Sequence, residues 1–284
     1  MRRKLRIIAS PIVPILFGPG RVLEAVASYP QAVYLTDGTR WISLVGPRTL
    51  LPPDGLQVEF DRPLAELLPV GTTLRIGGGR IELPNGERVV PEPGLRYWIP
   101  RLPRRRIVAA PSVQLADRLL AELPPAPPHE DPFLALALPR LRSLHAGLLR
   151  TLRDFRDADA LERAAGLAGL GPGLTPLGDD LLAGTCLALD LLARVDSTVP
   201  WVAYRETLAE TAATRTTARS AAWLRQAARG EFAREYLALA AAVSRADERR
   251  SRAFLRRVLT IGSTSGWGVA TGFLRTFHRL ARST

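Results

Sequence analysis

Alanine usage changes abruptly near residue 110, and this change constrains the fold more than any other feature of the sequence. Only 7 of the first 110 residues are alanine, against 32 of the remaining 174. Before the change, short β-branched and aromatic runs alternate with turns that contain Gly or Pro; after it, apolar residues recur at helical spacing. The sequence therefore predicts an α+β protein, with a β-rich domain over residues 1–110 and an all-α helical domain over residues 111–284.

Turn signals organise the expected β-rich domain. They are Asp37-Gly38, Gly77-Gly78-Gly79 and Asn85-Gly86, which tolerate the positive φ of tight hairpins. The expected strands cover residues 31–36, 40–45, 56–60, 74–76, 80–83, 88–90 and 95–99. Short strands at this spacing predict a small antiparallel barrel or sandwich.

The second domain is expected to contain eight helices joined by short connections. They are predicted over residues 113–123, 132–154, 158–167, 176–194, 201–229, 232–245, 248–260 and 267–281. The proline-rich segment Leu123–Pro128 cannot be helical, so it is expected to form a stiff connector after the first helix.

Charge and composition exclude several classes of protein. The net charge is +12, but acidic residues are interspersed with the basic ones, so a solvated surface with some anion affinity is expected rather than a nucleic-acid partner. No apolar stretch approaches the roughly 18 residues of a membrane helix. Prolines interrupt the N-terminal apolar run, which disfavours a signal peptide. With Cys186 as the single cysteine, neither an internal disulfide nor a Cys-based zinc site can form. A cytoplasmic protein is expected.

The segment 169–180, GLGPGLTPLGDD, carries the clearest functional signal. Thr175 followed by Pro176 predicts an N-cap and first-turn pair, which places Asp179 and Asp180 in or just after the first turn of a helix. The preceding glycines would let the backbone approach a ligand, and the positive helix end favours a phosphate or carboxylate. The structural alternative is a tight connection whose acidic residues complement the helix dipole.

A second segment combines hydroxyl groups with arginines. Thr214, Thr217 and Ser220 follow one another at i+3 spacing and are expected to line one helix face. Arg215 and Arg219 form an adjacent i,i+4 pair, and hydroxyls beside guanidinium groups suit an oxyanion. The alternative is a polar face used only for packing.

A third segment, Gly262–Gly268, contains three glycines and three hydroxyl side chains ahead of an expected helix. It is interpreted either as a second anion cradle at a helix start or as an ordinary turn between helices. We expect all three segments to converge on one pocket.

Residues 171–184 resemble the hallmark of a bacterial family that includes AllH, a subunit of oxamate carbamoyltransferase. The usual form is G-x-G-L-T-P-S-G-D-D-x-L-A-G, and this chain departs from it at Leu177, where serine is typical. The segment 214–220 resembles the family's polar helix. Gly262–Gly268 resembles its G-H-[ST]-S-G-x-D segment, with Ser263 and Gly268 in place of the histidine and the aspartate.

The resemblance implies a subunit of a multi-subunit enzyme of allantoin breakdown that converts oxalurate and phosphate into oxamate and carbamoyl phosphate. A companion subunit similar to acyl-CoA synthetases would be its partner, and a small anion its ligand. Asp179 and Asp180 would be the catalytic carboxylates, contacting an amide nitrogen or a divalent cation; no other cofactor is evident. The candidate ligand contacts are Gly171, Gly173, Leu174, Thr175, Gly178, Thr217, Ser220, Ser263, Thr264, Ser265 and Gly266. The alternative is a non-catalytic scaffold or ligand-sensing subunit.

Overall fold

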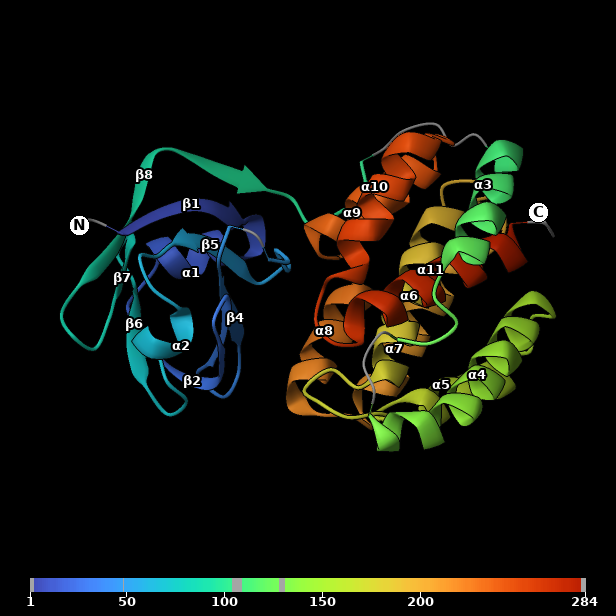
Figure 1. Cartoon of the computed structure of the whole chain (residues 1–284), viewed down its shortest axis with the longest axis horizontal. Coiled ribbons are helices and arrows are strands. Elements are labelled where there is room, and N and C mark those ends of the chain that lie inside the picture. The colour runs from blue at the N-terminus through green and yellow to red at the C-terminus, as the bar shows by residue number, and fades with distance from the viewer. Residues whose placement is uncertain (1–2, 48, 104–108, 128–130, 282–284) are drawn as a thin grey trace. The chain divides into compact units, whose positions relative to one another are not determined.

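The computed structural model describes residues 3–47, 49–103, 109–127 and 131–281 (Figure 1). Contacts between Cα atoms divide the chain into two compact units, Met1–Pro100 and Arg101–Thr284. In the described part of the chain, all strands lie in the first unit and the long helices lie in the second. The α+β class is therefore confirmed.

The first unit is a closed barrel of eight strands. The strands are β1 (Arg3–Ala9), β2 (Arg21–Tyr29), β3 (Ala32–Thr36), β4 (Trp41–Val45), β5 (Gly55–Glu59), β6 (Thr73–Gly77), β7 (Arg80–Glu82) and β8 (Arg88–Trp98). Around the barrel they follow the order β1-β5-β4-β3-β2-β6-β7-β8. The short helical segments of this unit are η1 (Ser10–Ile12), α1 (Val13–Phe17) and α2 (Leu64–Leu67).

The three predicted hairpins are confirmed, since β3–β4, β6–β7 and β7–β8 are antiparallel neighbours. The sandwich alternative is wrong because the sheet closes on itself. The expectation of a purely antiparallel sheet is also wrong, since β1 pairs with β8 and β4 with β5 in parallel. Strand β1 lies between β5 and β8 and closes the barrel. Inward side chains such as Leu5, Leu23, Leu35 and Val58 fill the barrel interior.

The second unit contains helices and no strand among its described residues. Its helices are α3 (Ala109–Glu122), α4 (Pro132–Arg153), α5 (Asp157–Leu167), α6 (Leu177–Leu192), α7 (Trp201–Ala213), α8 (Ala218–Ala228), α9 (Arg234–Val243), α10 (Glu248–Leu259) and α11 (Ser265–Leu280). Seven of the eight predicted helices are confirmed with ends shifted by a few residues. The connector is non-helical over residues 123–127, and Pro128 lies outside the described residues.

The predicted single helix over residues 201–229 is wrong, because the chain breaks into α7 and α8. Thr217 adopts an extended backbone with ψ 153°, and its side chain accepts a hydrogen bond from the Ser220 amide. Such an N-cap satisfies an amide that a continuous helix would bond internally. The polar sequence around residue 215 thus ends one helix and starts another.

Helix α6 is the centre of the second unit, and every one of its residues is buried. Figure 1 shows α6 and α11 side by side. A Cβ on Gly268 would lie 2.6 Å from Cβ of Asp180, and a Cβ on Gly184 would lie 2.7 Å from the Phe273 amide nitrogen. Early residues of α6 therefore meet early residues of α11, and later residues meet later ones. The two helices run parallel in close contact, with their N-termini at the same end.

None of the helices in the described ranges is both long and apolar enough to cross a membrane.

Candidate functional site

The N-termini of α6 and α11 are joined by a hydrogen bond between two hydroxyl groups. Thr175, in the loop before α6, lies with Oγ1 3.1 Å from Oγ of Ser265, the first residue of α11. Both side chains are partly exposed. Because the two helices are parallel, their positive dipole ends meet at this point, which favours negative charge there.

Thr175 does not have the role that the sequence suggests. Pro176 occupies the N-cap position, and no side chain caps the helix, which begins at Leu177. The extended backbone of Pro176, with ψ 147°, delays the helix by one residue and frees the Thr175 hydroxyl to face α11. The expected placement of Asp179 and Asp180 in the first turn is confirmed.

Asp179 is buried and accepts hydrogen bonds from three donors. They are the Gly169 amide at 3.0 Å, the Ser220 hydroxyl at 2.7 Å and the Thr216 hydroxyl. Burial raises the pKa of this carboxyl above its ordinary value, while the three hydrogen bonds act in the opposite direction. The carboxylate thereby ties the Gly-rich loop to the start of α8.

Asp180 is fully buried, and neither of its side-chain oxygens has a hydrogen-bond partner among the described residues. Burial raises its pKa well above the ordinary range, and the charge of Asp179 raises it further. The hydroxyls of Ser265 and Thr175 lie close enough to oppose this shift in part. A carboxyl in this setting holds its proton more tightly than an exposed one.

Some glycines of the motifs are needed for close packing of the backbone, whereas Gly173 has free space beside it. A Cβ on Gly178 would lie 1.9 Å from the Leu167 carbonyl oxygen, and a Cβ on Gly266 would lie 1.9 Å from that of Val258. Close backbone packing accounts for both glycines. Gly173, in contrast, has φ +94° and no atom within 4 Å of its Cβ position, so that side of the residue faces open space.

Gly171, with φ +126°, lets the loop fold onto the start of α6, since a Cβ there would lie 2.7 Å from the Leu177 amide nitrogen. The neighbouring Leu174 carbonyl accepts a hydrogen bond of 2.7 Å from the Thr217 hydroxyl. The same hydroxyl accepts from the Ser220 amide at 3.2 Å. The first and second predicted segments are therefore in direct contact.

The predicted hydroxyl face of Thr214, Thr217 and Ser220 is wrong, because these residues do not share a helix. Thr214 is the C-cap of α7 and bonds to the Thr211 carbonyl, whereas Thr217 is the N-cap of α8. The i,i+4 relation of Arg215 to Arg219 fails for the same reason, since Arg215 precedes α8 and Arg219 lies within it.

Sequence reasoning missed Thr216, whose hydroxyl bonds to Asp179. The signal that would have found it is the helix break, which turns this side chain toward α6. In the third segment, Ser265 reaches Thr175, Thr264 is buried before α11, and Ser263 is exposed. The three predicted segments thus lie together around the start of α6.

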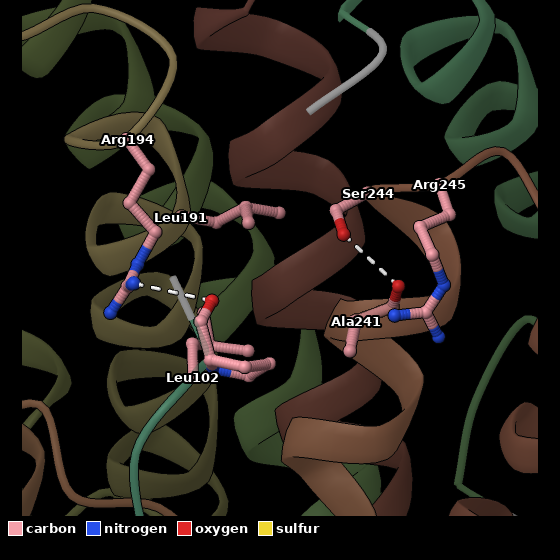
Figure 2. Close-up of a pocket in the computed structure, with 7 residues that line it drawn as sticks. Leu102, Leu191, Arg194, Ala241, Ser244 and Arg245 are labelled. Atoms are coloured by element: carbon pink, nitrogen blue, oxygen red, sulfur yellow. Dashed lines mark hydrogen bonds between the residues drawn. The ribbon is translucent and has the colours of Figure 1, made fainter. Parts of the chain in front are cut away.

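A small recess, with room for about one water molecule, lies elsewhere in the helical unit (Figure 2). Leu191 and Arg194 place it near the opposite end of α6 from Asp180. Its polar groups are engaged locally: Arg194 bonds to the Pro103 carbonyl, and Ser244 to that of Ala241. It contains none of the predicted site residues.

In the described ranges, no group of three or more His, Cys, Asp or Glu side chains could hold a metal ion. A divalent cation at Asp179 and Asp180 would therefore need further ligands from its substrate or from water. Of these two carboxyls, Asp180 is the one whose oxygens have no hydrogen-bond partner among the described residues, and it is completely buried.

The similarity to a known family lies within the helical unit. Residues 167–277 match the family model of oxamate carbamoyltransferase subunit AllH. The AllH match confirms the resemblance seen in the motif, and its range contains the Gly-rich loop, the Thr216–Ser220 turn and the start of α11. No curated protein and no solved structure shows significant similarity to the chain.

Proposed function

We propose that this chain acts as a subunit of an oxamate carbamoyltransferase-type system and binds a small carboxylate- or phosphate-bearing anion at the start of α6. The observation that carries the proposal is the convergence of three segments, all within the AllH-matched range, on the paired N-termini of α6 and α11. The AllH name supports companion subunits, among which a protein similar to acyl-CoA synthetases is the expected partner.

Carbamoyl transfer requires two anions to be oriented and the charge on the transferring group to be stabilised. Preorganised dipoles and hydroxyls can supply both without a protein nucleophile. Whichever of the Thr175 and Ser265 hydroxyls accepts from the other would donate to the ligand, and Gly173 would let it approach the backbone. Of the two proposed catalytic carboxyls, Asp180 would contact the ligand, and Asp179 would hold the loop and α8 in position.

The remaining candidates receive narrower roles in this proposal. Leu174 and Thr217 fix the Gly-rich loop through their hydrogen bond, and Gly171, Gly178 and Gly266 allow the close packing that shapes it. Ser263 and Thr264 belong to the turn that leads into α11 and would line the outer side of the site.

A non-catalytic, ligand-sensing role is the second candidate. The departures at Leu177, Ser263 and Gly268 remove a hydroxyl, an imidazole and a carboxylate from the family pattern. A chain that kept the anion site but lost these groups would bind ligand and leave the chemistry to its companions.

Titration calorimetry on the full chain tests the proposal, with carbamoyl phosphate, oxamate and inorganic phosphate as separate probes. We expect saturable binding of at least one of them at a single site. The Glu162→Gln variant, which loses one exposed charge on α5, should bind the same probes as the wild type does. Absence of binding by a folded wild-type protein would contradict both the enzyme and the sensing role.

A further inference from the structure

The two carboxyl groups at the start of α6 differ in their hydrogen-bond donors. Asp179 accepts from an amide and two hydroxyls, which stabilise its ionised form. Asp180, next to it in the chain, has no bonded partner on either oxygen among the described residues. Asp180 has only the nearby hydroxyls of Ser265 and Thr175, whereas Asp179 is held by three formed hydrogen bonds, so the proton of the pair resides on Asp180.

An apolar side chain and a glycine border Asp180 on the side of α11. The Cβ position of Gly268, on α11, is 2.7 Å from Cδ1 of Leu177 and 3.6 Å from the Asp180 carboxyl carbon. Leu177 therefore packs where a side chain at position 268 would otherwise approach the carboxyl. The groups that face Asp180 are the charge of Asp179 on its own helix, the Ser265 hydroxyl on α11 and the Thr175 hydroxyl. No basic side chain contributes to the shift in the pKa of Asp180.

We propose that Asp180 works as a neutral carboxylic acid whose O–H donates a hydrogen bond to a carboxylate or phosphate oxygen of a ligand bound between the N-termini of α6 and α11. This inference rests on the proposed anion site and assigns Asp180 its role there. The carboxyl lies next to the two hydroxyls at the junction of these helices, and it is the fully buried group of that junction with no partner.

A neutral Asp180 resolves the electrostatic conflict of an anion beside an acidic pair. An ionised carboxylate would repel the ligand, whereas a carboxylic acid offers it a donor. The negative charge of the pair stays on Asp179, where three donors compensate it. The predicted ligand class is a small anion with an oxygen acceptor and no cationic group directed at Asp180.

Two substitutions of Asp180 test whether ligand binding depends on a hydrogen-bond donor or on a negative charge at this position. Asp180→Asn keeps the size and a donor group, so the folded variant should bind oxamate or phosphate within about threefold of the wild type. Asp180→Leu removes the donor but remains compatible with the neighbouring Leu177, and it should bind about 10- to 100-fold more weakly. Far-UV circular dichroism establishes that both variants fold.

The pH dependence and an infrared spectrum give readouts that do not depend on the variants' affinities. Between about pH 5 and about pH 9, wild-type affinity for oxamate should be constant or fall, because ionisation of Asp180 removes the donor. At neutral pH, the infrared difference between wild type and Asp180→Leu should contain the C=O band of a protonated carboxyl.

Equal affinities of the Asn and Leu variants, an affinity that rises with pH, or the absence of the carboxyl band would each overturn the inference while leaving the anion site intact. Failure of the wild-type chain to bind carbamoyl phosphate, oxamate and inorganic phosphate would overturn the proposed function as well.

Discussion

Leu177 and Gly268 occupy complementary space at the start of the α6–α11 pair, with Cδ1 of Leu177 2.7 Å from the position of a Cβ on residue 268. These are two of the three positions at which the chain departs from the family pattern. Leu177 replaces the serine of that pattern with a larger apolar side chain. Gly268 replaces its aspartate and has no side chain, which leaves space for Leu177. The two departures are therefore one coupled change in packing, which places an apolar side chain beside Asp180 on the side of α11.

The coupling predicts non-additive stabilities. Gly268→Ala should lower the free energy of unfolding by about 1–3 kcal/mol, because the new methyl overlaps Leu177 and Asp180. In a Leu177→Ala background the same change should cost about 1 kcal/mol less. Thermal unfolding followed by far-UV circular dichroism measures both. Gly166→Ala on α5 is the control, since its Cβ would meet Leu144 at an ordinary 3.4 Å. Additive costs for the pair would show that the two residues do not share space.

The sequence predicts those parts of the fold that neighbouring residues determine, and it does not predict contacts between distant segments. Asp37-Gly38 and Asn85-Gly86 locate hairpins because the turn conformation is encoded in two residues. The parallel pairing of β1 with β8 is not predictable in this way, because it joins strands about 90 residues apart. The first strand was also hidden, since its residues precede Pro11 and Pro14 and resemble the apolar start of a leader segment.

The candidate site shows the same division. The first-turn placement of Asp179 and Asp180 follows from Pro176 and its flanking sequence. The different environments of the two carboxyls do not, because Asp179 takes its donors from Gly169 and Ser220 while Asp180 faces α11. Adjacent residues on a helix point about 100° apart, and only the packing of other helices decides what each one meets.

A buried histidine predicts an acid sensitivity of the helical unit. Nε2 of His145 lies 3.0 Å from the Thr185 hydroxyl, and since that hydroxyl donates to the Leu181 carbonyl, the imidazole is the donor to it. Burial, assisted by the charge of Arg275, lowers the pKa of His145 to about 3. The unfolded chain binds this proton near pH 6.5, so folding becomes less favourable as the pH falls below that value.

We expect His145 to cost the wild-type protein about 3 kcal/mol of stability between pH 6.5 and pH 4. His145→Gln keeps a donor toward Thr185 but cannot titrate, so its stability should fall less over the same interval. Urea unfolding at a series of pH values measures the difference between the two slopes. Parallel slopes would show that His145 is protonated in the folded protein.

Asp180 predicts a pH dependence of the opposite sign. Its pKa is raised by burial in the folded state, so the native protein binds this proton more tightly than the unfolded chain does. This contribution is unfavourable above the ordinary Asp pKa and disappears as the pH falls below it. Asp180→Asn should therefore have a higher Tm than the wild type at about pH 8, by a few degrees, and the gap should close toward about pH 4. A variant with a lower Tm at every pH would mean that the ionised carboxylate is stabilised in the native state.

The open backbone at Gly173 gives the last prediction. Gly173→Val should abolish binding of oxamate or carbamoyl phosphate, because valine strongly disfavours φ +94° and its side chain would fill the space from which a ligand approaches the loop. Strain alone is controlled by Gly94→Val, since Gly94 has φ +91° and also no atom within 4 Å of its Cβ position, but belongs to β8. Both substitutions should lower the free energy of unfolding by about 1–2 kcal/mol, and only the first should remove the calorimetric binding signal. If Gly173→Val binds as tightly as Gly94→Val, the ligand does not contact the backbone at residue 173, and the Gly-rich loop serves only to start α6.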